Sequence, residues 1–258
     1  MKTSFRLDKY LADMAVGTRT EVKNMIRKGL VTVNGEVIRR PEHKVDIEKD
    51  RLQCGGRDVV YQTCVYYMLN KPAGVITATN DKRQKTVLDL ITDKERRDLF
   101  PVGRLDKDTE GLLLITNDGG LAHQLLSPKK HVSKLYKARV EGCVTDEDVR
   151  LFAEGLRMDE EWTALPAELK ILSAGPESEV EVVIYEGKFH QIKRMFEVVG
   201  KKVVALKRLS MGTLQLDETL EPGAYRPLTA EELEALRGSA DKRRAAVIQR
   251  GYERINVK

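Results

Sequence analysis

Three carboxylates occur at alternate positions in one short segment of the chain. Asp106, Asp108 and Glu110 lie within residues 103–111, and the apolar run 112–115 follows at once. A carboxylate at such a junction can be held by ordered backbone and still face a cleft. There it could act as a nucleophile, as a general acid or base, or as a counter-ion to developing positive charge. Two other interpretations stay open on residue types alone: a solvated turn, and a glycosidase-like pair formed by Asp106 and Glu110.

Residues 103–119 read Gly-Arg-Leu-Asp-Lys-Asp-Thr-Glu-Gly-Leu-Leu-Leu-Ile-Thr-Asn-Asp-Gly. This segment resembles the catalytic motif of the RsuA-type pseudouridine synthases, which isomerise a uridine of ribosomal RNA. The resemblance implies that Asp106 is the catalytic aspartate, and such a carboxylate is expected to be kept ionised by a nearby cation. The reaction needs no cofactor and no metal, and the sequence contains neither a Walker motif nor a cluster of metal ligands.

Two further residues match the catalytic set of that family. Tyr136, in Lys-Leu-Tyr, corresponds to the tyrosine that stacks on the target base and can accept a proton. Lys193, in His-Gln-Ile-Lys-Arg-Met, corresponds to the basic residue that pairs with the aspartate. Arg194 is its rival for this role. Adjacent helix positions point about 100° apart, so only one of the two can face the same carboxylate, and Lys193 is favoured.

Several other residues near these motifs are expected to contact RNA or to shape the site. The target base must leave its stack, and Arg104 is the candidate for filling the vacated space or holding a phosphate. Asp108 and Thr109 are expected to organise the loop. His123 and His190 have no serine and carboxylate arranged around them, so a hydrolase triad is unsupported. Further RNA contacts are expected from Lys71, Lys129, Lys130, His131 and Arg194.

The first 50 residues predict a small module of two helices and a hairpin. Apolar residues recur at helical spacing in residues 6–14, a capping box at 18–21 opens a second helix, and Asn-Gly joins two short strands within 31–38. This pattern resembles an S4 RNA-binding domain over roughly residues 5–50. The resemblance implies that one helical face lies against structured RNA, and the basic residues of the second helix are Arg19, Lys23, Arg27 and Lys28.

The rest of the chain predicts closely spaced strands with helices between them. The fold class is therefore α+β, with an S4-like module followed by a catalytic domain that has a mixed, mainly antiparallel sheet flanked by helices. We expect domains at 1–60 and 61–238 and a basic tail at 239–258. The strands are expected at 65–69, 75–78, 135–141, 179–185 and 203–209, and the helices at 86–91, 121–126, 145–155, 192–199 and 229–237.

Composition agrees with an RNA partner and excludes several other classes. The net charge is +5, and the tail from residue 239 has six basic and two acidic residues, a net charge of +4. The chain has no apolar run of membrane-spanning length and no secretory signal, so we expect a cytoplasmic protein without a membrane partner. Cys54, Cys64 and Cys143 are widely spaced and are interpreted as ordinary thiols rather than disulfide or zinc residues.

The sequence therefore predicts an isomerase that acts as a monomer on ribosomal RNA, with a uridine of the small subunit as the favoured target. A uridine of the large-subunit RNA is the alternative. A non-catalytic RNA-binding or ribosome-assembly protein with the same fold is the rival from another class. The presence of Asp106, Tyr136 and Lys193 together argues against that rival, because a binding protein has no use for them.

Overall fold

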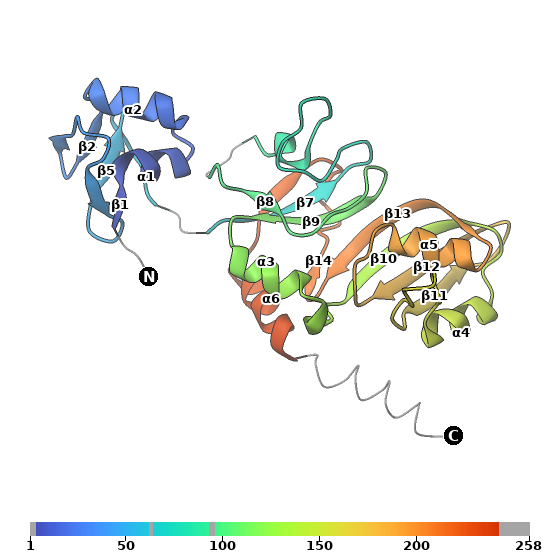
Figure 1. Ribbon diagram of the computed structural model, residues 1–258. Helices are drawn as coiled ribbons and strands as arrows, with labels where there is room; N and C mark the ends of the chain where they lie inside the picture. Colours follow the sequence, from blue (N-terminus) through green and yellow to red (C-terminus); the bar gives the residue numbers. More distant parts are fainter. Residues whose placement is uncertain (1–3, 62–63, 93–95, 243–258) are drawn as a thin grey trace. The chain divides into compact units, whose positions relative to one another are not determined.

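The protein consists of two compact units, shown in the ribbon diagram of a computed structural model (Figure 1). The structure describes residues 4–61, 64–92 and 96–242. The first unit contains residues 1–65 together with 91–99, and the second contains 66–90 and everything from residue 100 onward. No sequence pattern indicated that 91–99 belongs with the first unit. Contacts with Asp13 link it to that unit: the buried Arg96 guanidinium lies 3.9 Å from the Asp13 carboxylate, and the Arg97 amide donates to the Asp13 carbonyl at 3.2 Å.

The first unit has the predicted two helices and hairpin. Thr18 and Glu21 form the capping box at the start of its second helix. Asn34 and Gly35 have φ values of 52° and 88°, as a tight hairpin turn between twisted strands requires. Two small sheets, in the orders β1-β4 and β3-β2-β5-β6, enclose the core with the helices. Its elements are β1 (Ser4–Arg6), α1 (Leu7–Asp13), α2 (Arg19–Arg27), β2 (Val31–Val33), β3 (Glu36–Val37), β4 (Lys44–Asp46), β5 (Leu52–Cys54) and β6 (Arg57–Asp58).

The second unit is built on one large sheet. Its main path runs β11-β12-β10-β13-β9-β7-β15, with β14 paired to β13 and β8 to β9. Among the strands that the structure describes, β9 with β13 is the one parallel pair, so the predicted mixed, mainly antiparallel sheet is confirmed. The strands are β7 (Tyr66–Lys71), β8 (Phe100–Pro101), β9 (Glu110–Thr116), β10 (Lys134–Glu141), β11 (Glu168–Ser173), β12 (Glu177–Ile184), β13 (Lys202–Met211), β14 (Leu214–Gln215) and β15 (Tyr225–Pro227).

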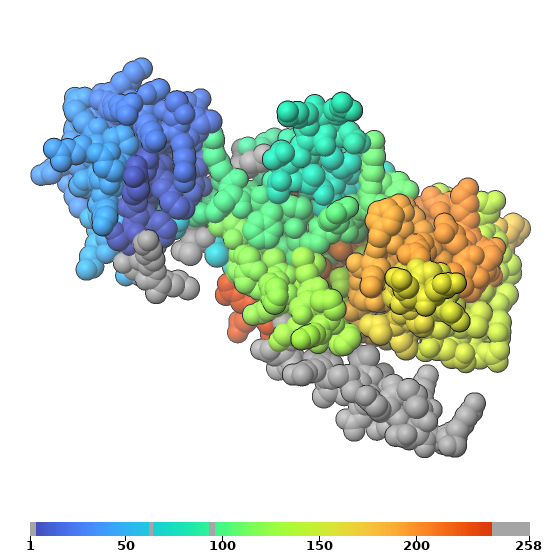
Figure 2. Space-filling model, in the orientation of Figure 1, coloured from blue at the N-terminus to red at the C-terminus, as the bar shows by residue number. Residues whose placement is uncertain are grey.

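Helices pack on this sheet in two groups. Near one end, α3 contacts α6, and their apolar residues join a core that includes Met68, Leu112 and Leu114. Near the other end, Phe152 of α4 packs against Phe196 of α5 with ring centroids 4.9 Å apart. The region around α5, coloured orange, forms part of the surface of this unit (Figure 2). The helices are η1 (Val87–Leu90), α3 (Gly119–Leu126), η2 (Pro128–Lys130), α4 (Asp146–Glu154), α5 (Gln191–Val198) and α6 (Ala230–Lys242).

Three predicted elements differ in the structure. Residues 75–78 form no strand and make a single isolated bridge, Ile76 with Thr86, because this segment turns toward the loop before β9 instead of joining the sheet. The helix expected at 86–91 is a short 3₁₀ turn. The final helix, expected at 229–237, continues through Gly238 to residue 242. An interior glycine costs a helix about 1 kcal/mol, which does not end it.

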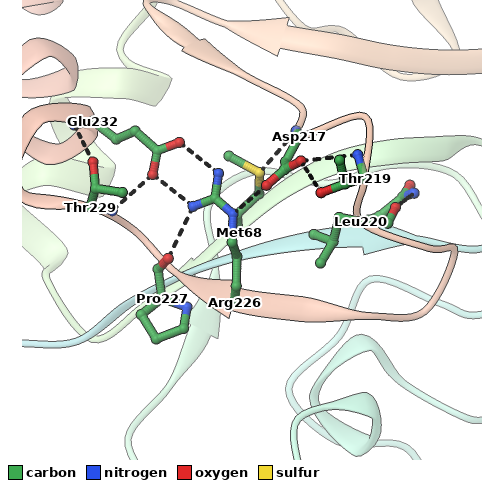
Figure 3. A network of polar contacts seen from close by, with 9 residues as sticks. Met68, Asp217, Thr219, Leu220, Arg226, Pro227, Thr229 and Glu232 are labelled. Carbon is green, nitrogen blue, oxygen red and sulfur yellow. Dashed lines mark hydrogen bonds and ion pairs between the residues drawn. The ribbon is translucent and has the colours of Figure 1, made fainter.

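A polar network centred on Arg226 attaches α6 to the edge strand β15 (Figure 3). Its guanidinium lies 2.7 Å from Asp217, in the turn after β14, and makes two 2.8 Å hydrogen bonds to Glu232 of α6. The Thr219 hydroxyl donates to Asp217 at 2.6 Å. Hydrogen bonds from Thr219, followed by the one from Arg226, lower the pKa of Asp217 from 3.8 to about 2.

This network predicts a specific dependence of stability on pH. Because the folded protein holds the pKa of Asp217 below its unfolded value of 3.8, its stabilising contribution is complete above about pH 4 and is lost as the pH falls toward 2. Asp217→Asn should therefore lower the melting temperature by a few degrees at pH 7, and this difference should shrink as the pH approaches 2. Thermal unfolding of both proteins at several pH values measures it, with the exposed neighbour Glu218→Gln as the control. A difference in melting temperature between the wild type and Asp217→Asn that stays the same from pH 7 to pH 2 would contradict the role given to the Asp217 carboxylate.

Candidate active site

The loop at residues 106–109, which precedes β9, is held by backbone and side-chain hydrogen bonds from the segment after β7. The Thr77 hydroxyl donates to the Leu105 carbonyl at 2.7 Å and accepts from the Leu105 amide at 3.2 Å. The Gly74 amide donates to the Lys107 carbonyl at 2.8 Å, and the Thr109 amide to the Asp106 carbonyl at 3.1 Å. These bonds fix the loop backbone and leave the Asp106 side chain 27% exposed.

Lys71 completes this support from inside the protein. It has no exposed surface, and its ammonium donates to the carbonyls of Pro72, Lys107 and Thr109 at 3.0, 3.3 and 2.8 Å. Burial lowers the pKa of Lys71 to about 8, against the opposing effect of the nearby carboxylates. The prediction that Lys71 lines the RNA path is therefore wrong. Its position at the end of a strand that is buried along its length draws the side chain inward, where unpaired carbonyls need a donor.

Replacing Lys71 tests this structural role. Lys71→Met keeps most of the side-chain volume but leaves three carbonyls without their donor, so we expect the free energy of unfolding to fall by about 2 kcal/mol. Urea unfolding monitored by circular dichroism measures the change. Lys82→Met, at an exposed loop position, is the control and should be neutral. A Lys71→Met protein as stable as the wild type would mean that the ammonium does not hold the loop.

Lys193, in the first turn of α5, brings a positive charge to this loop. Its ammonium lies 3.4 Å from Asp106 Oδ2, and 2.6 and 2.8 Å from the two oxygens of Asp108. The hydrogen bond from Lys193 is the largest cause that lowers the pKa of Asp108. Burial alone would lower the pKa of Lys193, but its hydrogen bond with Asp108 and the charge of Asp106 raise it. One ammonium thus serves two carboxylates, and Asp108 takes the closer contacts.

Arg194 points elsewhere. Its guanidinium lies 2.9 Å from Asp159 and 4.9 Å from the ring centroid of Trp162. The two adjacent helix positions therefore face different neighbours, as the 100° rotation per residue requires. Of the two rivals, Lys193 is the residue that the structure places beside Asp106.

His190 also lies in this site, although the sequence predicts no catalytic role for it. Its Nε2 lies 3.5 Å from Asp106 Oδ1, so the carboxylate has Lys193 near one oxygen and the imidazole near the other. The residue occupies the N-cap position of α5 in a left-handed conformation with a φ of 51°. A histidine in this motif draws attention first as a member of a hydrolase triad, and this one has no such partners. The signal that could have found it is its spacing of three residues from Lys193, because positions three apart lie on one side of a helix.

Tyr136 lies on the inward-facing side of β10 and is 7% exposed. It pairs in register with Arg208 of β13, and Arg208 pairs with Gly111 at the start of β9. The Arg208 guanidinium is buried and donates to the Leu112 carbonyl at 2.8 Å. Three adjacent strands therefore place Tyr136, Arg208 and the end of the Asp106 loop along one line across the sheet.

Another buried cation, Lys134, lies on β10 two residues before Tyr136. Lys134 is 8% exposed and donates to the Val132 carbonyl at 3.0 Å. Burial, followed by the charge of Arg208, lowers the pKa of Lys134 to about 8. The sequence does not predict Lys134 or Arg208 as site residues. Each is a basic residue in a strand, and its neighbours depend on how the strands of the sheet pair, which the sequence pattern does not show.

Comparison with known proteins gives the family. The model of the RNA pseudouridylate synthase family matches residues 65–198, and the S4 domain model matches residues 5–52. The uncharacterized RNA pseudouridine synthase YtzG of Bacillus subtilis is 46% identical over 90% of this chain and 98% of its own length. The chain belongs to the RNA pseudouridylate synthase family. Its N-terminal S4 domain and its likeness to the relatives below place it in the RsuA-type group.

Two other relatives and one solved structure agree with this family assignment. The ribosomal small subunit pseudouridine synthase A of Vibrio cholerae is 39% identical and covers 90% of this chain and 99% of its own. The ribosomal large subunit pseudouridine synthase B of Bacillus subtilis is also 39% identical, with coverages of 92% and 97%. A crystal structure of a pseudouridylate synthase superposes with a TM-score of 0.64 at 36% identity, over 90% of this chain and 99% of that one.

The contacts to Asp106 described above include none of the other residues of this synthase that are predicted to bind RNA. Arg104 and Lys129 are exposed, and Lys130 and His131 are half-buried. On the S4 domain, Arg19 and Arg27 of α2 and Lys28, which follows the helix, are exposed, and Lys23 is half-buried. Most of the predicted basic tail, residues 243–258, lies outside the described residues. In the part of the chain that the structure describes, no helix is long and apolar enough to cross a membrane, and the three cysteines are free thiols.

Proposed function

We propose that this synthase converts one specific uridine of ribosomal RNA to pseudouridine, with Asp106 as the catalytic carboxylate. The proposal rests on the position of Asp106. This residue lies between Lys193 and His190, in a loop whose backbone is held by the buried Lys71 ammonium. The small-subunit RNA is our favoured target. A relative of equal identity that is named for the large subunit makes large-subunit RNA the alternative.

Asp106 is suited to the demanding step, which is breaking the bond between C1′ and N1. The bonding electrons leave with N1, and the carboxylate can attack C1′, stabilise its positive charge, or remove a proton from the sugar. The uracil then turns and rejoins the ribose through C5. The proton of C5 is lost and N1 gains one, so the product is an isomer of the substrate. Lys193 carries the balancing positive charge beside the carboxylate.

Tyr136 is the proposed partner for the base. Its ring lies on the inward face of the sheet, in register with Arg208 and the start of β9. A base that has left its stack recovers part of the lost energy by stacking on an aromatic ring. The Tyr136 oxygen, as the phenolate, can then accept the proton that C5 must lose, which leaves a neutral phenol. Arg104, exposed two residues before Asp106, is proposed to fill the space that the base leaves in the RNA.

We further propose that the S4 domain docks on structured ribosomal RNA through the basic residues of α2. Exposed guanidinium and ammonium groups on one helix suit a phosphate backbone. Lys129, Lys130, His131 and Arg194 are proposed as additional contacts, and the basic tail as a further one. The protein is expected to act as a monomer in the cytoplasm.

The test is a pseudouridine map of ribosomal RNA. RNA from a strain that lacks the gene should be missing one pseudouridine, and the wild-type gene should restore it. The position of that uridine also decides between small- and large-subunit RNA. Identical maps with and without the gene would favour the rival function, a binding or assembly protein that has kept the fold without the reaction.

A further inference from the structure

Phe189 exposes an aromatic ring beside the carboxylate that we propose as catalytic. The residue is 69% exposed, although a phenylalanine side chain normally gains by being buried. Its ring stacks on the His190 imidazole, with centroids 3.8 Å apart and planes inclined by 18°. The same imidazole reaches to 3.5 Å of Asp106. The His190 imidazole therefore connects the exposed Phe189 ring to the Asp106 carboxylate.

The turn that carries Phe189 is held in place on both sides. Gln191, which is buried, accepts a hydrogen bond from the Lys188 amide at 3.0 Å and donates from its side chain to Glu186 at 2.8 Å. Its own amide donates to the Lys188 carbonyl at 3.2 Å. The ring of Phe189 is thus presented on a braced turn, so a partner that stacks on it would pay little ordering entropy.

The neighbours of Phe189 indicate what kind of partner fits. Lys188 and Arg194 hold their cations 5.4 and 4.9 Å from the ring centroid of Trp162, and Lys193 lies in the first turn of α5. Gly187 and Lys188, which precede the phenylalanine, are exposed and not apolar. A protein partner would need a wider apolar patch. An exposed ring that directly follows Lys188, four and five residues before Lys193 and Arg194, matches a single-stranded nucleic acid, whose bases stack while its phosphates face positive charge.

We propose that Phe189 stacks on a base of the RNA next to the target uridine and holds that part of the strand while the target base enters the site. This inference rests on the proposed function, and it adds a residue that recognises the flanking nucleotide. Stacking of one base on an aromatic side chain corresponds to about 5- to 150-fold in affinity. The contact exists before and during the reaction, so it should affect KM rather than kcat.

The test measures steady-state turnover on a ribosomal RNA fragment that contains the mapped uridine. Phe189→Ala should raise KM about 5- to 150-fold and leave kcat within about threefold. Phe189→Trp should restore KM to near the wild-type value, because any aromatic face can stack. Val198→Ala is the matched control, an exposed apolar residue at the other end of α5, 47% exposed, and should change nothing. Equal melting temperatures for these variants would show that folding is not involved.

An abasic nucleotide, placed on each side of the target in turn, supplies the second measurement. At the position that stacks on Phe189, removing the base should weaken the binding of this RNA to the wild-type protein. It should also make the RNA affinities of the wild type and of Phe189→Ala equal. A KM for Phe189→Ala within twofold of the wild type, or a Phe189→Trp protein as weak as Phe189→Ala, would overturn the inference while the proposed function stands. A wild-type protein without any turnover would instead overturn the proposed function, and this inference with it.

Discussion

Replacing Asp106 by Asn is expected to reduce pseudouridine formation by about 10³-fold or more, while RNA binding stays within a few-fold of the wild type. An amide has nearly the same shape as a carboxylate but can neither attack C1′ nor take a proton from the sugar. It also cannot balance the positive charge that develops as the bond to N1 breaks. The contacts to RNA proposed for the S4 domain are untouched. Single-turnover assays and filter binding on the same RNA measure the two effects separately.

Asp108→Asn is the matched control for this experiment. Asp108 is also a carboxylate of the same loop, and it makes the shorter contacts to Lys193, at 2.6 and 2.8 Å. Its side chain is 72% exposed, and we assign it no role in the chemistry. We expect at most about a tenfold loss, through a less restrained Lys193. If Asp108→Asn were the inactive variant and Asp106→Asn the active one, the assignment of the catalytic carboxylate would be wrong.

Replacing Gly111 by Ala is expected to lower the free energy of unfolding by about 3 kcal/mol or more. A Cβ at this position would lie 2.2 Å from the Arg208 carbonyl oxygen and 2.9 Å from its amide nitrogen. The φ of Gly111 is +98°, a conformation that an alanine adopts only with strain. The atoms that it would meet belong to backbone, so β9 and β13 would have to move apart. Because β9 begins at the Asp106 loop, activity should fall together with stability.

Gly119→Ala is the control for Gly111→Ala. Gly119 is the first residue of α3, and a Cβ there would meet nothing within 4 Å. Alanine favours a helix more than glycine does, so this variant should be as stable as the wild type or up to about 1 kcal/mol more stable. Urea unfolding of both variants gives the comparison. A Gly111→Ala protein that unfolds at the wild-type urea concentration would show that the two strands do not approach as closely as the structure has them.

Local sequence was sufficient where one short segment determines the structure. The capping box at Thr18 and Glu21 and the Asn34-Gly35 turn depend on hydrogen bonds and backbone angles within a few residues, and both are present. The alternating strand at Glu177–Ile184 is likewise confirmed, because a period of two reports which side chains face the core. The family followed from one contiguous motif around Asp106.

The tertiary structure decided which distant groups meet that motif. Lys71 and Thr109 are 38 positions apart, and only the packing of β7 beside β9 turns the lysine from an expected RNA contact into a buried support. His190 reaches Asp106 across 84 positions, and its spacing from Lys193 gains meaning only once the fold brings α5 to the Asp106 loop. A sequence records local periodicity and turn chemistry directly. Burial and long-range contact depend on how strands align with one another, and that alignment is settled only when the whole sheet forms.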